Sequence, residues 1–282
     1  MESAGYHFAL RAARAVARLG PKVTPRAAAT ARENLRLVYG RADPALLFAT
    51  YRHFAEAAVD CLYFRRLFSP DRFDEHFELA GPGWEHFARL QPHGSVLVTG
   101  HFGNWELYGA AFGHAGIHVT PVGRSPERLW FASRLDRFRR SLGVETIDKE
   151  NALPLAMKAL RRGAAVAFLN DQAAGRHGIA VPFLGRPAHT FIAPAALAAK
   201  FRVPLYAGYS TRVGDGIRYR CWSELVEPGA TVEETTARCN EILGGYVRAC
   251  PEQWWWFHRR FKPPRAQRQG AALTPAGLPV AE

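Results

Sequence analysis

Residues 95–107 read SVLVTGHFGNWEL, and this stretch decides the expected fold. Ser95–Thr99 is a short apolar and β-branched run of the kind that forms an interior strand. Asn104 is a favourable helix N-cap, so we expect a helix to begin directly after it. The stretch therefore predicts a buried strand, a short loop that carries His101, and a helix with Glu106 in its first turn.

The loop and the helix start together suggest a catalytic pair. Glu106 lies five positions after His101, where its carboxylate could reach back toward the imidazole. A carboxylate bonded to one ring nitrogen fixes the tautomer, leaves the other nitrogen free as a base and stabilises the imidazolium that forms. Gly100 and Gly103 leave the flanking backbone bare for a substrate. The alternative is a structural histidine whose hydrogen bonds serve only the fold.

From about Phe73 onward, short apolar runs alternate with helical patterns. Such alternation predicts an α/β fold in which helices flank a mainly parallel central sheet, with antiparallel additions near residues 209–222, where the connection is short. The expected strands are Val96–Thr99, Ile117–Gly123, Val144–Ile147, Ala165–Leu169, Val203–Thr211 and Ile217–Trp222. The expected helices are Trp105–His114, Glu127–Leu142, Ala152–Arg161, Phe191–Phe201 and Val232–Ala249.

Polar side chains follow directly on three of these strands. They are His101, Arg124 and Asp171. In open α/β sheets the ligand crevice lies outside the carboxyl ends of the strands. We therefore expect all three side chains to line one crevice.

The chain before the sheet is expected to be helical, over residues 6–20, Pro25–Val38 and Pro44–Phe68. Arg11, Arg14 and Arg18 interrupt the first helix, whereas a spanning helix needs about 20 mostly apolar residues. It is expected to lie on a membrane surface, or alternatively to be an ordinary surface helix. The expected organisation is a membrane-associating helical segment at residues 1–70, an α/β domain at 71–262 and a disordered tail at 263–282.

Composition restricts the partners. Lys and Arg number 37 against 25 Asp and Glu, which gives a net charge of +12 and favours an anionic partner. No nucleic-acid-binding motif accompanies this charge, so we expect no nucleic-acid partner. The four cysteines lack zinc-site spacing, and no histidine cluster suggests a metal. The first residues lack the features of a signal peptide, which predicts catalysis facing the cytoplasm.

Four motifs in consistent order carry a family resemblance. They are TGHFGNWEL (residues 99–107), VGR (122–124), FLNDQ (168–172) and PEQWWWFHRRFK (251–262). The first resembles the His-x-x-x-x-Glu motif of the bacterial lipid A biosynthesis acyltransferases, the lauroyl and myristoyl transferases, and of the related phosphatidylinositol mannoside acyltransferases. The similarity extends over roughly residues 32–262.

The resemblance implies a glycerolipid acyltransferase-like fold and an acyltransferase that moves groups other than aminoacyl groups. The acyl chain would pass from an acyl-carrier-protein or CoA thioester, with no further cofactor, to a hydroxyl of a membrane glycolipid similar to a lipid A precursor. The implied location is the cytoplasmic face of the bacterial inner membrane, attached peripherally to an anionic surface. The basic helix expected at Glu127–Leu142 would dock the acidic carrier protein, unless it is only a solvated face.

The resemblance also implies roles for individual residues. The implied catalytic residues are His101, Glu106, Arg124 and Asp171. Arg124 would stabilise the oxyanion, with N–H groups at the start of the Asn104 helix as the alternative. Asp171 would hold Arg124 or bind the acceptor sugar, unless it is only a turn residue. The implied substrate-binding residues are Gly103, Asn104, Gln172, Arg259 and Arg260.

Two further functions stay open on the sequence alone. The acceptor could instead be phosphatidylinositol mannoside or another glycolipid. Alternatively, the chain could be a non-catalytic protein that binds anionic glycolipid or membrane. Trp254, Trp255 and Trp256 fit either a bilayer surface or a packed core.

Overall fold

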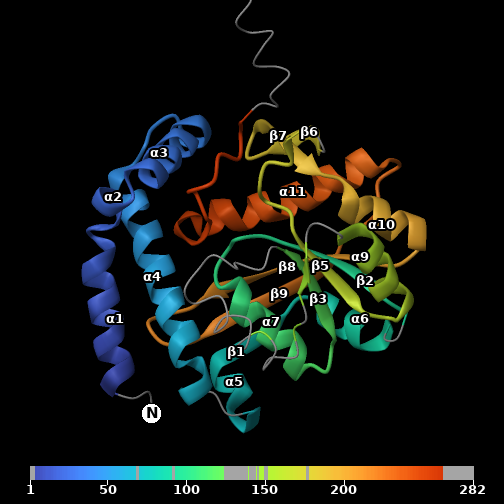
Figure 1. Ribbon diagram of the computed structural model, residues 1–282, viewed down its shortest axis with the longest axis horizontal. Coiled ribbons are helices and arrows are strands. Elements are labelled where there is room, and N and C mark those ends of the chain that lie inside the picture. The colour runs from blue at the N-terminus through green and yellow to red at the C-terminus, as the bar shows by residue number, and fades with distance from the viewer. Residues whose placement is uncertain are drawn as a thin grey trace, which may run out of the picture.

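The computed structural model describes residues 4–67, 70–90, 93–123, 139, 144, 146–148, 152–175 and 178–262. The expected helix Glu127–Leu142, apart from Arg139, and the tail after Lys262 lie outside these residues. The N-terminal part is helical as predicted: α1 (Ala4–Ala17), α2 (Gly20–Val23), α3 (Pro25–Tyr39) and α4 (Pro44–Leu67). Figure 1 shows α1 at one edge of the molecule, along the long helix α4.

A seven-stranded sheet forms the centre of the fold, in the order β1-β9-β8-β2-β5-β3-β4. Its pairs are parallel except β8 with β9, where Tyr209 faces Trp222, so the predicted antiparallel addition is confirmed. The strands are β1 (Phe77–Ala80), β2 (Ser95–Thr99), β3 (Val119–Gly123), β4 (Ile147–Asp148), β5 (Ala165–Leu169), β8 (Leu205–Arg212) and β9 (Tyr219–Leu225).

Helices cover both faces of this sheet, and β2 is buried along its whole length. Val96 and Val98 pack into one core with α10 (Ala193–Phe201) and α11 (Val232–Ala249). Leu97, which points to the opposite face, packs into a second core with α6 (Gly83–Leu90) and α7 (Trp105–His114). This double burial explains why the strand is apolar at consecutive positions rather than alternating.

Several elements were not predicted. The short strand β1 was missed, as was the two-stranded hairpin of β6 (Gly178–Phe183) and β7 (Arg186–Phe191). Pro182 and Pro187 face one another in that hairpin, and proline argues against a strand in sequence patterns. The helix α6 and the short elements η1 (Pro70–Arg72), α5 (Phe73–His76) and η4 (Pro251–Gln253) were also missed, whereas α9 (Ala152–Arg161) has the predicted bounds.

Candidate active site

The parallel pairing of β2 with β5 brings His101 and Asp171 together. Thr99 is in register with Leu169, so the residues two positions further on emerge side by side at the carboxyl edge of the sheet. The Nδ1 atom of His101 lies 2.8 Å from Asp171 Oδ1, and the main-chain nitrogen of His101 donates to Asp171 Oδ2 at 2.8 Å. Both residues lie at this sheet edge as predicted. Their direct contact was not predicted, because Asp171 was expected to hold Arg124 or to bind the acceptor sugar.

Asp171 is a buried carboxylate, and both of its oxygens accept hydrogen bonds. Besides His101, the indole nitrogen of Trp254 donates to its Oδ2 at 3.0 Å. Burial by itself would raise the pKa of Asp171, but the charge of His101 and these hydrogen bonds prevail and lower it to about 2. The group is therefore ionised at neutral pH, and Nδ1 of His101 must carry the proton that it shares.

Asp171 in turn raises the pKa of His101. Burial acts to lower this pKa, and the charge of Asp171, its hydrogen bond and the charge of Glu106 together outweigh burial. Since Nδ1 donates to Asp171, the other ring nitrogen, Nε2, is the one available to accept a proton. The side chain of His101 keeps 21% of its surface exposed, so a substrate has access to the ring.

Glu106 does not make the contact that the sequence predicts. Its carboxylate accepts two hydrogen bonds from Arg139, Nε to Oε2 at 2.8 Å and Nη2 to Oε1 at 2.6 Å, and a third from Trp105 Nε1 at 3.1 Å. The guanidinium fork matches a carboxylate in two places, which favours this pairing over one bond to an imidazole. Glu106 acts on His101 through its charge, and Asp171 takes the place at the ring.

The loop from His101 to Asn104 is fixed by its main chain. Gly103 donates to the carbonyl of Gln253 at 2.8 Å, and Asn104 donates to Ser210 Oγ at 3.1 Å. The main-chain N–H of His101 is bound to Asp171. The N–H groups of His101, Gly103 and Asn104 are therefore all occupied and cannot bind an oxyanion. The N–H groups of the next two residues, in the first turn of α7, precede the helical hydrogen-bond ladder and remain candidates.

Gly103 and Asn104 were expected to bind substrate, but they hold the loop instead. Gly103 has a φ of +59°, and a Cβ there would collide with the carbonyl oxygen of Ser210. Asn104 is buried, caps α7 by accepting from Leu107 N at 3.2 Å, and donates to the carbonyl of Ala57. Both residues are enclosed by protein, so neither presents a free group to a ligand.

The remaining predicted residues separate into three groups. Arg124 lies outside the described residues. Gln172, the residue after Asp171, and Arg259 are exposed and stay candidates for binding substrate. Arg260 is fully buried and donates to the carbonyls of Gln172 and His189, at 3.3 and 2.7 Å, and to Thr190 Oγ1 at 2.7 Å. Its expected contact with substrate is therefore wrong: it ties the turn after β5 to β7.

The three consecutive tryptophans have different surroundings. Trp254 and Trp256 are buried in the core, which favours packing over a bilayer surface for these two. Trp255 is half-buried and lies against Trp105, whose ring meets His101 edge to face at 5.0 Å. An aromatic wall thus stands beside the imidazole of His101.

Sequence reasoning missed two partners of the site, Trp254 on Asp171 and Arg139 on Glu106. For the pair of His101 with Asp171, a usable signal was present. Both residues stand two positions after strands of equal length, as neighbouring parallel strands in matched register require. Among the described residues, no group of three or more His, Cys, Asp or Glu side chains is arranged to hold a metal ion.

Comparison with known proteins gives consistent matches. Residues 2–263 match the family described as bacterial lipid A biosynthesis acyltransferase. The lipid A biosynthesis lauroyltransferase of Escherichia coli is 30% identical over 189 residues, 64% of this chain and 60% of that protein. The lipid A biosynthesis palmitoleoyltransferase of the same species is 28% identical, over 69% of this chain and 65% of that protein.

A phosphatidylinositol mannoside acyltransferase of Mycobacterium tuberculosis is 25% identical over 167 residues, 57% of this chain and 52% of that protein. The matched regions thus span between about half and two thirds of these relatives.

Proposed function

The chain belongs to the bacterial lipid A biosynthesis acyltransferase family, and from this premise we propose that it transfers a fatty acyl chain from a thioester to a hydroxyl of a membrane glycolipid. Relatives named as lipid A and as phosphatidylinositol mannoside acyltransferases support an acceptor that is a glycolipid. Both acceptor types remain within the proposal, as do acyl carrier protein and CoA as the group that carries the acyl chain.

The pairing of His101 with Asp171 is the observation that carries this proposal. A hydroxyl has a pKa far above neutrality, so its attack on a carbonyl needs a base, and such assistance contributes about 100- to 10,000-fold. In the proposed step, Nε2 of His101 takes the proton as the hydroxyl oxygen bonds to the thioester carbon. Asp171 stabilises the imidazolium through Nδ1. The C–S bond then breaks, and the imidazolium returns the proton to the leaving sulfur.

The same chemistry needs no covalent enzyme intermediate. A thioester already has a good leaving group, and the loop holds a histidine where a nucleophile elbow would need a serine. The developing oxyanion requires donors in a water-poor site. We assign this role to Arg124 or to the first-turn N–H groups of α7, and we assign to Glu106 and Arg139 the support of the wall beside His101.

We propose a membrane-facing surface on α1, α2 and the two-residue turn between them. Four large apolar side chains point to solvent there, with exposures between 51% and 74%: Phe8, Val16, Leu19 and Val23. Arg11 and Arg18 are exposed on the same two-helix segment, whereas Arg14 is bonded to Glu56 and Asp215. Exposed apolar groups with flanking cations suit the interface of an anionic bilayer. No described helix has the length and apolar character needed to cross a bilayer.

An assay with the purified chain tests the function. Acyl carrier protein and CoA thioesters are supplied separately, each with a lipid A precursor or a phosphatidylinositol mannoside in detergent, and EDTA is present throughout. We expect acylated glycolipid and free thiol in equal amounts with at least one donor and acceptor. Binding of glycolipid without thiol release from any donor would instead support the non-catalytic alternative.

A further inference from the structure

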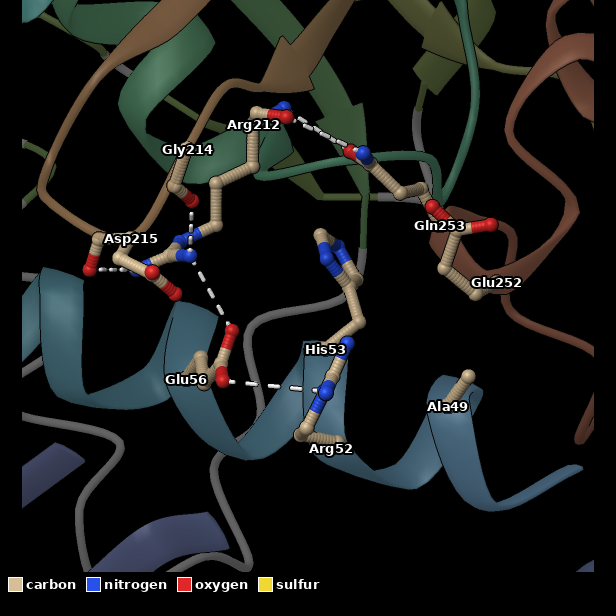
Figure 2. Close-up of a pocket in the computed structure, with 9 residues that line it drawn as sticks. All are labelled: Ala49, Arg52, His53, Glu56, Arg212, Gly214, Asp215, Glu252 and Gln253. Carbon is tan, nitrogen blue, oxygen red and sulfur yellow. Dashed lines mark hydrogen bonds and ion pairs between the residues drawn. The ribbon is translucent and has the colours of Figure 1, made fainter. Parts of the chain in front are cut away.

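A polar pocket lies directly behind the catalytic loop, on the side of α4. It has a volume of about 160 Å³, and Figure 2 shows the side chains that surround it. The imidazole of His53 points from α4 into this pocket, between Arg212 and Gln253 (Figure 2). None of these residues takes part in the proposed acyl transfer, so the pocket needs an explanation of its own.

His53 contacts the main chain of the loop that carries His101. Its Nε2 lies 3.0 Å from the carbonyl oxygen of Gly103, two residues after His101. A carbonyl oxygen can only accept, so Nε2 carries the hydrogen and Nδ1 carries the lone pair. The side chain of His53 is buried, with 5% of the residue exposed, and its ring packs edge to face on Phe54. Burial of the ring limits the access of water to this hydrogen bond.

The other polar group of Gly103, its N–H, is held by Gln253, whose carbonyl accepts it at 2.8 Å. Gln253 is itself fixed, because its side-chain amide accepts from Arg212 N at 2.9 Å and donates to Arg212 O at 3.2 Å. The guanidinium of Arg212 is bound by Asp60 at 2.9 Å and Glu56 at 3.1 Å. Two residues that line the pocket thus hold both main-chain polar groups of Gly103: His53 binds the carbonyl and Gln253 binds the N–H.

We propose that His53 is a positioning residue for the catalytic histidine. By holding the Gly103 carbonyl, it fixes the backbone between His101 and the start of α7 and so keeps the imidazole of His101 aligned on Asp171. Gly103 adopts a left-handed conformation and lies against the backbone of Ser210. Without His53 its buried carbonyl would have no partner, which is costly, so the peptide group would turn to find one and the loop would shift. This inference rests on the proposed acyl transfer only for its kinetic consequences.

His53 does this as a neutral group. Burial lowers its pKa to about 4, against the hydrogen bond to Gly103, and the charges of Arg212 and Arg52 lower it further. The other charged groups that line the pocket are Glu56, Asp215 and Glu252. His53 therefore stays uncharged where His101 works as a base, and it does not contribute to the pH dependence of the reaction.

Three variants separate positioning from general destabilisation. In His53→Gln, the amide nitrogen stands where Nε2 stood and can still donate to Gly103. In His53→Met, a side chain of similar length fills the space without a donor. Arg52→Gln is the matched control, because Arg52 lines the same pocket, is half exposed, and forms only one long ion pair, of 3.9 Å with Glu56, within the part of the chain that the structure describes.

We expect His53→Met to lower kcat about 10- to 100-fold with KM within about twofold, because small misplacements of a catalytic group cost rate rather than binding. His53→Gln should recover kcat to within about fivefold of the wild type and keep the same acidic limb of the pH profile. Arg52→Gln should keep both constants. Wild-type kcat in the methionine variant, or an equal loss in the glutamine variant, would overturn the assignment.

A second readout does not depend on turnover. The Nδ1 proton of His101, shared with a buried carboxylate, should give a downfield proton resonance in the wild type and in His53→Gln, and a shifted or missing one in His53→Met. If the wild type transfers no acyl group but this pattern is found, the proposed function fails and the positioning role stands. If the resonance is the same in all variants, the positioning role fails. Should the methionine variant not fold, His53→Asn replaces it, because its amide is too short to reach Gly103.

Discussion

His101 binds Asp171 twice, through ring Nδ1 and through its main-chain nitrogen, each at 2.8 Å. One carboxylate therefore sets both the position of the backbone and the orientation and tautomer of the ring. Gly100 favours this close approach, because a Cβ there would lie only 3.1 Å from the carboxylate carbon and would push Asp171 outward. The proposed catalysis depends on this pair more than on any other contact.

Asp171→Asn should leave the fold intact and lower kcat about 100- to 10,000-fold. The amide keeps the shape of the carboxylate but removes the charge that stabilises the imidazolium. It also keeps only one acceptor oxygen, which the N–H groups of His101 and Trp254 require, so an amide nitrogen would face Nδ1 and favour the wrong tautomer. Steady-state turnover at saturating substrate, with circular dichroism and thermal unfolding as controls on folding, measures the effect. A folded variant with near-normal turnover would remove Asp171 from the mechanism.

Glu106→Gln should be milder than Asp171→Asn, because Glu106 acts on His101 through its charge and holds Arg139. We expect Glu106→Gln and Arg139→Gln to be non-additive in a double-mutant cycle, with a coupling of about 0.5–3 kcal/mol. Both kcat and the thermal midpoint are followed. Fully additive effects would mean that the ion pair between the two side chains does not contribute in solution.

The contrast between these two carboxylates shows what the sequence could predict. Strand β2, the loop and α7 follow from the apolar run and the cap at Asn104, and the structure has them within one residue of the prediction. The order of the strands is a long-range property, and it alone brings residue 171 opposite residue 101. Proximity along the chain favoured Glu106, although Arg139 offers its carboxylate two hydrogen bonds.

The same limit applies to the basic C-terminal run. A sequence of His258, Arg259, Arg260 and Lys262 suggests a surface that binds anions. Arg260 instead enters the interior, where neutral oxygen atoms on β7 and α11 accept hydrogen bonds from its two Nη atoms. Burial of a guanidinium depends on acceptors that are far away in the sequence, so no local pattern reveals it.

The rate should fall on the acidic side with an apparent pKa above 6.5, the ordinary value for histidine. The base must be neutral to accept a proton, and Asp171 raises the pKa of His101, so activity is lost as the pH drops through this raised value. In Asp171→Asn, the residual activity should show its acidic limb at lower pH, because the stabilising charge is gone. The profile of kcat/KM against pH measures the acidic limb in the wild type and in the variant. An acidic limb at the same pH in both proteins would contradict this assignment.

Binding to anionic vesicles should depend on the apolar side chains of α1 and α2 more than on Arg14. Replacing Phe8, Val16, Leu19 and Val23 with serine should weaken sedimentation with vesicles at least about tenfold, because burial of apolar surface supplies about 25 cal/mol per Å².

Arg14→Gln is the matched comparison, since its guanidinium is bonded to Glu56 and Asp215. It should lower the thermal midpoint and leave vesicle binding nearly unchanged. Turnover on detergent-dispersed substrate should persist in the serine variant. Equal vesicle binding by the serine variant and the wild type would place the membrane contact elsewhere on the molecule.

Mass spectrometry of lipids tests the proposed acyl transfer most directly. Lipids are compared from cells that lack the chain, cells that overproduce it, and cells that overproduce His101→Ala to the same level. We predict a glycolipid that is heavier by one acyl group in the wild-type cells and depleted both in the cells lacking the chain and in those with the alanine variant. If the alanine variant restores this glycolipid as fully as the wild type, His101 is not the base, and the proposed mechanism is wrong.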